Sequence, residues 1–459
     1  MFEFGRELKR LFGTEGANAP RDGMTGGDSS LLELLDLRLL GEEAKAANVA
    51  AGRVSATDKA QRQLEAAIVW REMARRSGDV ISLRHAAAKA EAAAESFGKD
   101  RRPDGWARAR CEQAYCAMLG AELFGDDGLN AAADRAFRDA RSVARGGLAG
   151  PLADLGIAAL EGRAVLASAD RTLAMAIAER FEAPIRGLET LTRRCSAARL
   201  MSVEARLVRS DLLLGWGARL KDRDMVERAL RDAEAASAGL DQSYEPLTMA
   251  RAAALRGQAL ALLGEITGQI ETLADAVSVL ADGLDDLRRE HSPLDWARVQ
   301  AALGQALQSL GEAGASEKAF EQAITCYDRA AMVLNEIPSL SLCAWAASNR
   351  ALCLARSAEL TGDLNVLSAA ETAFRIELTA MSPGRNPTGW AMLQVNLARL
   401  YEARVEITGT DRGERTAAAT ALNAALDVFS EQGLHSLSVI AADALARVTR
   451  QAPQGRLAH

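Results

Sequence analysis

Residues 249–264, MARAAALRGQALALLG, and residues 296–311, WARVQAALGQALQSLG, decide the fold because they are two copies of one phrase. They are identical at nine of sixteen positions, including the glycines at the ninth and sixteenth. A Pro-Leu pair stands shortly before each copy. Self-similarity at a fixed distance is typical of a repeat array.

A Trp-Ala dipeptide marks other copies of the phrase, at distances that are multiples of roughly 47 residues. We expect about eight repeats within residues 58–450, and we interpret the tryptophans as core anchors. Repeats with the dipeptide begin at Trp106, Trp296, Trp345 and Trp390, and repeats without it begin near Lys59, Leu155, Ser202 and Met249.

The composition favours helices throughout. Hydrophobic residues make up 49% of the 459 residues but aromatic residues only 4%, and alanine supplies much of the difference. Each repeat reads as two helices joined by a short polar turn, such as Gly125-Asp126-Asp127 or Gly362-Asp363. In the second helix, alanine recurs at matching positions, which would allow close packing: Ala133, Ala229, Ala276, Ala323 and Ala417, then Ala140, Ala236, Ala330 and Ala424.

This pattern resembles the tetratricopeptide repeat. That family has Leu-Gly with an aromatic three residues later in the first helix, and Ala-x3-aromatic-x2-Ala in the second. Similar residues here are Leu303-Gly304 with Leu307, Leu397-Ala398 with Tyr401, Ala133 with Phe137 and Ala140, and Ala323 with Tyr327 and Ala330. The family repeat has about 34 residues, so this chain is similar to a long-period bacterial type.

The resemblance implies an all-α fold, a right-handed α-solenoid of stacked helical hairpins. It also implies a concave surface, lined by the first helices, that holds a partner protein. Polar side chains four or six residues after the repeat starts are candidates for that surface; the alternative is that they are ordinary solvated helix positions. They are Arg110, Gln300, Asn349, Gln394 and Asn396.

Segments outside the array have their own patterns. Residues 1–13 predict an amphipathic helix and residues 14–29 a flexible linker. Residues 30–57 predict a leucine-rich helical cap, with a capping box from Ser30 to Glu33, and residues 451–459 a disordered tail.

The first helix has three possible roles. It could dock on a partner or on the array, lie weakly on a membrane surface, or cap the first repeat. Its candidate contact residues are Phe4, Leu8, Leu11 and Phe12.

No catalytic constellation is visible. The four histidines, His85, His291, His435 and His459, are far apart in the sequence, and phosphate-loop and nucleophile-elbow motifs are absent. We therefore expect a protein that is not an enzyme and has no cofactor and no metal. Six cysteines without C-x-x-C spacing indicate buried thiols in a reducing compartment.

Charge and hydropathy limit the partners. A formal charge of −7 without a basic stripe argues against nucleic acid, and no apolar run is long enough to span a bilayer. We expect a cytoplasmic scaffold or adaptor that binds protein partners. The alternatives are a ligand- or peptide-responsive regulator, and a non-catalytic subunit that delivers substrate to a modification or secretion machine. The sequence leaves the oligomeric state open.

Overall fold

The computed structural model describes most of the chain, and every regular element in the described part is a helix. The predicted N-terminal helix, nearly all of the predicted linker and the C-terminal tail lie outside the described residues. The described ranges are 29–53, 58–166, 170–193, 195–337, 341–381, 383–384, 387–432 and 435–450.

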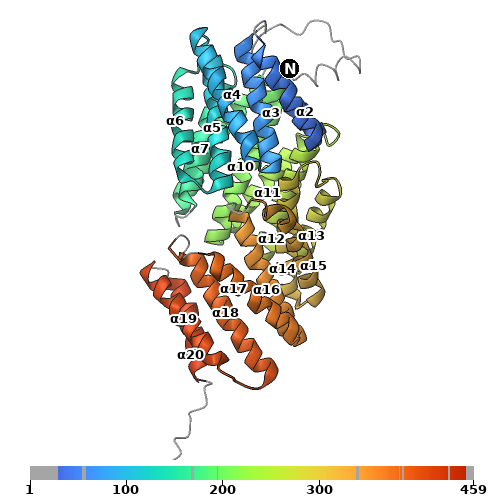
Figure 1. The fold of residues 1–459 in the computed structure, drawn as a ribbon, viewed down its shortest axis with the longest axis vertical. Helices are drawn as coiled ribbons and strands as arrows, with labels where there is room; N and C mark the ends of the chain where they lie inside the picture. The colour runs from blue at the N-terminus through green and yellow to red at the C-terminus, as the bar shows by residue number, and fades with distance from the viewer. Residues whose placement is uncertain are drawn as a thin grey trace, which may run out of the picture. The chain divides into compact units, whose positions relative to one another are not determined.

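The chain divides into two compact units. Unit 1 comprises Met1–Ala306 and Val333–Ser341, and unit 2 comprises Leu307–Met332 and Leu342–His459. Figure 1 shows the helices labelled in chain order. Unit 1 contains η1 (Ser29–Leu34), α2 (Leu37–Gly52), α3 (Lys59–Ser77), α4 (Val80–Lys99), α5 (Pro103–Phe124), α6 (Asp127–Val143), α7 (Ala149–Val165), α8 (Arg171–Glu179), α9 (Glu182–Leu191), α10 (Ser196–Leu220), α11 (Arg223–Ala238), α12 (Pro246–Thr267), α13 (Ile270–Asp285) and most of α14 (Pro293–Gly314).

Successive helices pack as hairpins, as the sequence predicts. In unit 1, α3 packs on α4, α5 on α6, α10 on α11 and α12 on α13. The second helices α4, α6 and α11 also pack on the first helix of the next hairpin, α5, α7 and α12 respectively. The first helices contact one another in turn, from α3 through α5, α7 and α10 to α12. This arrangement buries both sides of each hairpin against its neighbours.

Gly-Asp pairs form the tight turns inside the hairpins. Gly78 and Gly125 end α3 and α5 with φ of 74° and 64°, in the left-handed region that glycine adopts without strain. The following Asp79 and Asp126 begin α4 and α6, where their carboxylates accept hydrogen bonds from backbone N–H groups. The predicted turn at Gly125-Asp126 is confirmed.

The third hairpin departs from the expected two helices because its second helix is broken into α8 and α9. Pro184 lies in the first turn of α9 and has no N–H to donate to the carbonyl four residues earlier, so a continuous helix through this point would be interrupted. Phe181, between the two pieces, is fully buried.

Alanine, more than tryptophan, fills the core at the Trp-Ala dipeptides. Ala107, Ala297, Ala346 and Ala391 are all buried. Trp106, Trp296 and Trp390 are half-buried and Trp345 is exposed, so the expectation that these tryptophans anchor the core is only partly met. The small side chain lets neighbouring helix backbones approach each other, and the indole covers the edge of that contact.

Unit 2 continues the hairpin pattern with the rest of α14 and with α15 (Glu317–Leu334), α16 (Ser341–Thr361), α17 (Leu364–Ala380), α18 (Pro387–Thr408), α19 (Glu414–Glu431) and α20 (His435–Arg450). In α19 the buried alanines are Ala418, Ala421 and Ala425, whereas the predicted Ala417 and Ala424 are only half-buried.

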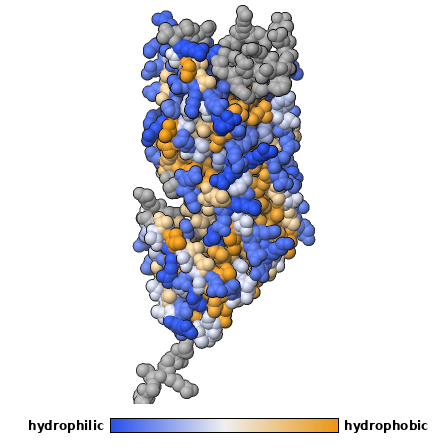
Figure 2. All heavy atoms as spheres, turned by 45° about the vertical axis from the view of Figure 1, so that its right-hand side comes forward, coloured by the Kyte–Doolittle hydropathy of each residue, from blue (hydrophilic) through white to orange (hydrophobic). Residues whose placement is uncertain are grey.

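None of the described helices is both long and apolar enough to cross a bilayer. On the face shown in Figure 2, apolar side chains occur in small groups between polar ones. The six cysteines are free thiols, four of them buried. Burial raises the pKa of Cys111 and of Cys353 to about 12, so neither is a reactive thiolate near neutral pH.

Candidate functional site

A cavity of about 750 Å³ lies inside unit 1, and six first helices supply most of its lining. These helices are α3, α5, α7, α10, α12 and α14. The sequence predicts a concave surface lined by first helices, and this is the face on which the cavity lies. Its volume falls within the range of small-molecule and peptide pockets.

An ion pair between the first and the sixth hairpin bounds the cavity. Arg75 on α3 donates from Nη1 to both carboxylate oxygens of Asp295 on α14, at 3.1 and 2.9 Å. Ser292 Oγ also donates to Asp295, at 2.7 Å. The ion pair thus joins α3 to α14, the first and the last of the six first helices that line the cavity. We call this contact the closure.

The segment before the array forms a second connection, between α3 and α12. Arg76 on α3 is fully buried and donates to the backbone oxygens of Leu32 and Leu35, at 2.8 and 2.7 Å. The Glu33 carboxylate accepts hydrogen bonds from the backbone N–H and the hydroxyl of Thr248 on α12. We call residues 29–36 the strap, because they connect α3 to α12.

The predicted capping box from Ser30 to Glu33 is wrong. Residues 29–34 form a 3-10 helix, and the Glu33 carboxylate binds Thr248 instead of its own backbone. Asp36 caps α2 by accepting from the backbone N–H of Leu39, at 2.8 Å. In the leucine-rich segment, Leu32, Leu35 and Leu40 are buried.

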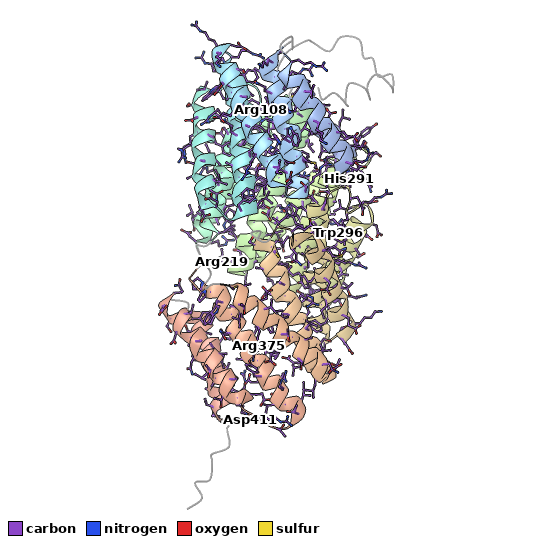
Figure 3. The ribbon with its side chains drawn as sticks, in the orientation of Figure 1. Arg108, Arg219, His291, Trp296, Arg375 and Asp411 are labelled. Atoms are coloured by element: carbon purple, nitrogen blue, oxygen red, sulfur yellow. The ribbon has the colours of Figure 1, made fainter. Side chains whose placement is uncertain are left out.

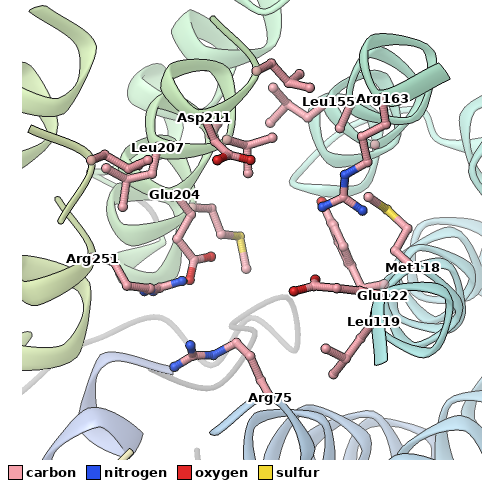
Figure 4. A pocket seen from close by; sticks show the side chains of 18 of the residues that line it. Arg75, Met118, Leu119, Glu122, Leu155, Arg163, Glu204, Leu207, Asp211 and Arg251 are labelled. Carbon is pink, nitrogen blue, oxygen red and sulfur yellow. The ribbon is translucent and has the colours of Figure 1, made fainter. Parts of the chain in front are cut away.

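The cavity wall combines apolar side chains with charged ones. Figure 4 shows Leu119, Leu155 and Leu207 beside carboxylates and guanidinium groups that point into one space. The acids that line it are Glu122, Glu204, Asp211 and Asp295, and the bases are Arg71, Arg75, Arg108, Arg163, Arg251 and Arg298.

Most of these charges are paired within the wall. Arg251 binds Glu204 at 3.2 Å, and Arg298 binds Glu122. Arg71 binds Glu112, a fully buried acid behind the wall. Such pairs offset part of the free energy of removing charges from water.

Two charges of opposite sign stay without a direct partner. Among the described residues, the side chains of Arg163 on α7 and Asp211 on α10 form no hydrogen bond or ion pair; both are exposed and point into the cavity (Figure 4). Arg108 on α5, labelled in Figure 3, is buried, and its Nε and Nη1 have no hydrogen-bond acceptor. Nη1 lies 3.6 Å from Glu112, beyond hydrogen-bonding distance.

The pKa values of two cavity acids, Asp211 and Asp295, are shifted in opposite directions. Desolvation raises the pKa of Asp211, and the charge of Arg163 only partly opposes this. Burial would also raise the pKa of Asp295, but the charges of Arg75, Arg251 and Arg298 outweigh it and bring the pKa to about 2. Asp295 is thus a structural anion, whereas the Asp211 carboxylate is exposed in the cavity and no ion pair balances its charge.

The predicted groove residues fall beside the cavity and do not line it. Arg110 donates to Asp139 on the neighbouring α6 and lies over the Trp106 ring. Gln300 is buried, and its Oε1 has no hydrogen-bond partner. Arg108 and Arg298, two positions earlier on the same helices, line the cavity instead, because two helical residues differ by about 200° in direction.

The other groove candidates belong to unit 2. Asn349 is half-buried and donates to the backbone oxygen of Trp345 in its own helix, at 2.9 Å. Gln394 and Asn396 on α18 are half-buried. They stay predictions, and Phe4, Leu8, Leu11 and Phe12 lie outside the described residues.

The described histidines do not form a catalytic group at the cavity. His85 on α4 stacks on Trp70, with ring centroids 4.7 Å apart, and His291 lies in the turn before α14, as Figure 3 shows. Neither lines the cavity. Within the described ranges, no group of three or more His, Cys, Asp or Glu residues has an arrangement that could hold a metal ion.

No protein-family model and no curated protein matches this sequence. Solved structures with a similar course include a Rap protein complexed with competence and sporulation factor, 10% identical with a TM-score of 0.47, covering 89% of this chain and 98% of the other. Aspartyl phosphate phosphatase F from Bacillus subtilis is 12% identical with a TM-score of 0.39 and the same coverages.

A signal-transduction ATPase from Pyrococcus horikoshii with a tetratricopeptide-repeat sensor is 13% identical, with a TM-score of 0.43, covering 95% of this chain and 57% of the other. All three likenesses are distant. The helices of the chain itself define its class: an all-α, tetratricopeptide-like array of sequential helical hairpins.

Proposed function

We propose that this chain is a non-catalytic scaffold of the long-period tetratricopeptide-like type, and that a short segment of a partner protein enters the cavity of unit 1. The observation that carries this proposal is the convergence of six first helices on one cavity with an apolar wall and a few charged groups. Binding sites for small ligands and peptides have this combination, in which apolar contacts give affinity and few polar groups give orientation.

The size of the cavity favours a segment over a folded surface. About 750 Å³ accommodates a few side chains with their backbone, whereas two folded proteins in a stable complex each bury on the order of 800 Å². Further contacts with the partner would therefore lie outside the cavity. Asn349, Gln394 and Asn396, and the N-terminal residues Phe4, Leu8, Leu11 and Phe12, are our candidates for them.

The chemistry of the lining supports binding over catalysis. A general acid or base needs a reacting group within hydrogen-bond reach and a partner that orients it. Here Glu122, Glu204 and Asp295 are engaged by arginines, and Asp211 has no orienting partner among the described residues. Lining side chains that are charged but unreactive are expected for recognition.

One contact favours the regulator as a second candidate function. The Arg251 Nη2 donates to the Thr248 hydroxyl at 2.7 Å and also binds Glu204 of the cavity wall. Thr248 in turn holds Glu33 of the strap. A ligand that attracts Glu204 or Arg251 would disturb this chain of contacts, so occupation of the cavity would loosen the strap.

Selection from a phage-displayed random octapeptide library on the immobilised full-length chain tests the proposal. Val208 is 36% exposed and lines the cavity, so Val208→Trp fills the cavity without overpacking the core. Val80 on α4 is 37% exposed and lies outside the lining, so Val80→Trp is the matched control. We expect peptides enriched by the unchanged chain and by Val80→Trp to be lost with Val208→Trp.

Two outcomes would count against the proposal. Equal enrichment by Val208→Trp would place peptide binding elsewhere on the chain. Selection without enriched peptides on the unchanged chain would remove the peptide segment as the occupant. Hydrogen exchange of residues 29–36, measured with and without a selected peptide, separates the two candidate functions. Faster exchange with the peptide indicates release of the strap and supports the regulator, whereas unchanged exchange supports a passive scaffold.

A further inference from the structure

Arg163 and Asp211 are charges of opposite sign that both line the cavity and are exposed to the water in it. An occupant that displaces this water has to pair or hydrogen-bond with both charges, because losing water costs several kcal/mol per ion. Asp211 is an exposed residue of the cavity lining, and partial desolvation raises its pKa. Both side chains point into the same space in Figure 4 without joining.

The two charges come from different helices of the cavity wall. Glu204 lies two helical turns before Asp211 on α10, so both carboxylates project from one face of that helix. Arg163 projects from α7, and Arg108 projects from the neighbouring α5. Apolar side chains, including Leu155 and Leu207, lie between the two sides.

Arg108 is an independent indication of a ligand. It is 9% exposed, and two of its three nitrogens, Nε and Nη1, have no acceptor in the described structure. An unsatisfied buried guanidinium is costly, and an acceptor on a bound molecule would supply the missing hydrogen bonds.

We propose that the segment entering the cavity carries charges of both signs: a cationic group that binds Asp211 and an anionic group that binds Arg163 and Arg108. The ligand class is therefore a short peptide with one basic and one acidic side chain separated by apolar residues. This inference rests on the proposed function, because it specifies the occupant of the same cavity. A purely apolar segment would leave both charges unsatisfied, and a purely acidic one would meet Asp211.

Proton linkage agrees with the proposed contact. A carboxylate whose pKa is raised by desolvation regains its ordinary acidity when a cation binds to it. Affinity for the basic group should therefore fall as the pH is lowered through the pKa of Asp211. The neutral acid keeps its shape but loses its attraction for an ammonium or guanidinium group.

The test uses octapeptides selected by the full-length chain, synthesised with blocked termini, and titrated calorimetrically. In each, the basic residue is replaced by norleucine or the acidic residue by glutamine. On the unchanged chain we expect each replacement to weaken binding about ten- to hundredfold, as loss of a charged hydrogen bond does. With the Asp211→Asn chain, the peptide that carries norleucine should bind as tightly as the peptide with its original basic residue. With the Arg163→Gln chain, the peptide that carries glutamine should bind as tightly as the peptide with its original acidic residue.

Matched variants keep the result specific. Asp282 and Arg231 are exposed acids and bases outside the cavity, so Asp282→Asn and Arg231→Gln should leave both discriminations intact. Far-UV circular dichroism checks that each variant is folded. One outcome would overturn this inference and leave the proposed function standing: the selected peptides do not bind the Val208→Trp chain, but their affinity for the unchanged chain is the same after either replacement. Absence of any selected peptide would overturn both.

Discussion

Arg75 and Asp295 form a two-point ion pair although 220 residues separate them. Arg75 is on the first helix of the first hairpin and Asp295 on the first helix of the sixth. Asp295 is almost fully buried, and Arg75 also binds Glu72 of its own helix. This contact joins the first and the last of the six first helices that line the cavity.

Replacing Arg75 should destabilise unit 1 strongly. In Arg75→Gln the buried Asp295 keeps only Ser292 and the more distant Arg298, and an uncompensated buried charge costs about 3–5 kcal/mol. Urea unfolding followed by circular dichroism measures the change. The control Arg141→Gln removes a surface pair with Asp154 and should cost less than about 1 kcal/mol. Equal losses in the two variants would contradict the importance of this closure.

Acid should weaken the same closure in a defined pH window. Asp295 has a pKa of about 2 in the folded chain and an ordinary value of 3.8 when unfolded. A lowered pKa stabilises the fold above the unfolded value, and that stability is lost as the pH falls from about 4 towards 2. The full contribution is roughly 2 kcal/mol. The stability difference between the unchanged chain and Asp295→Asn should be constant at pH 5–7 and shrink below pH 4.

Asp211 should show the opposite sign. Its raised pKa means that the charged form opposes folding at neutral pH, and that this penalty disappears below the ordinary pKa of 3.8. Asp211→Asn should therefore raise the thermal midpoint at pH 7, with an advantage that vanishes as the pH approaches 4. Asp282→Asn, on the surface, should show no such trend. A lower midpoint for Asp211→Asn at pH 7 would mean that Asp211 has a structural partner.

The sequence predicts the helices and hairpins well because their signals are local. The residue types of Gly125-Asp126 are enough to predict a turn there, and buried alanines such as Ala133 and Ala229 recur at regular spacing. The closure by Arg75 and Asp295 has no local signal. It depends on small rotations accumulated over six hairpins, and no pattern within one repeat encodes their sum.

The side of each first helix that faces the cavity is also hard to predict. The buried residues of α12 include Leu247, Ala250, Ala252 and Ala254, which do not fall on one face. Because a first helix packs on most of its sides, its polar residues lack the clear stripe of a surface helix. Counting from Trp106 and Trp296 therefore selected Arg110 and Gln300, where Arg108 and Arg298 face the cavity.

The strap should depend on the geometry of Arg76 as well as its charge. Arg76→Lys keeps the charge, but one ammonium cannot reproduce the planar fork that reaches both Leu32 and Leu35. Loss of one charged hydrogen bond should cost about 1.5–3 kcal/mol. Hydrogen exchange of residues 32–40 should accelerate, while exchange in α18 and α19 should not change. The exposed Arg38 provides a control, since Arg38→Lys should leave the strap protected.

The glycine at the ninth position of both copies of the repeated phrase can be tested at Gly257. A Cβ there would lie 2.4 Å from Leu280 Cγ, too close for the packed pair α12 and α13. Gly257→Ala should destabilise the chain by about 1–3 kcal/mol through overpacking, although alanine favours a helix by about 1 kcal/mol over glycine. Gly150→Ala, in α7 with nothing within 4 Å of the added carbon, should be neutral or slightly stabilising. Thermal unfolding compares the two variants, and a stabilised Gly257→Ala would show that α12 and α13 do not pack this closely.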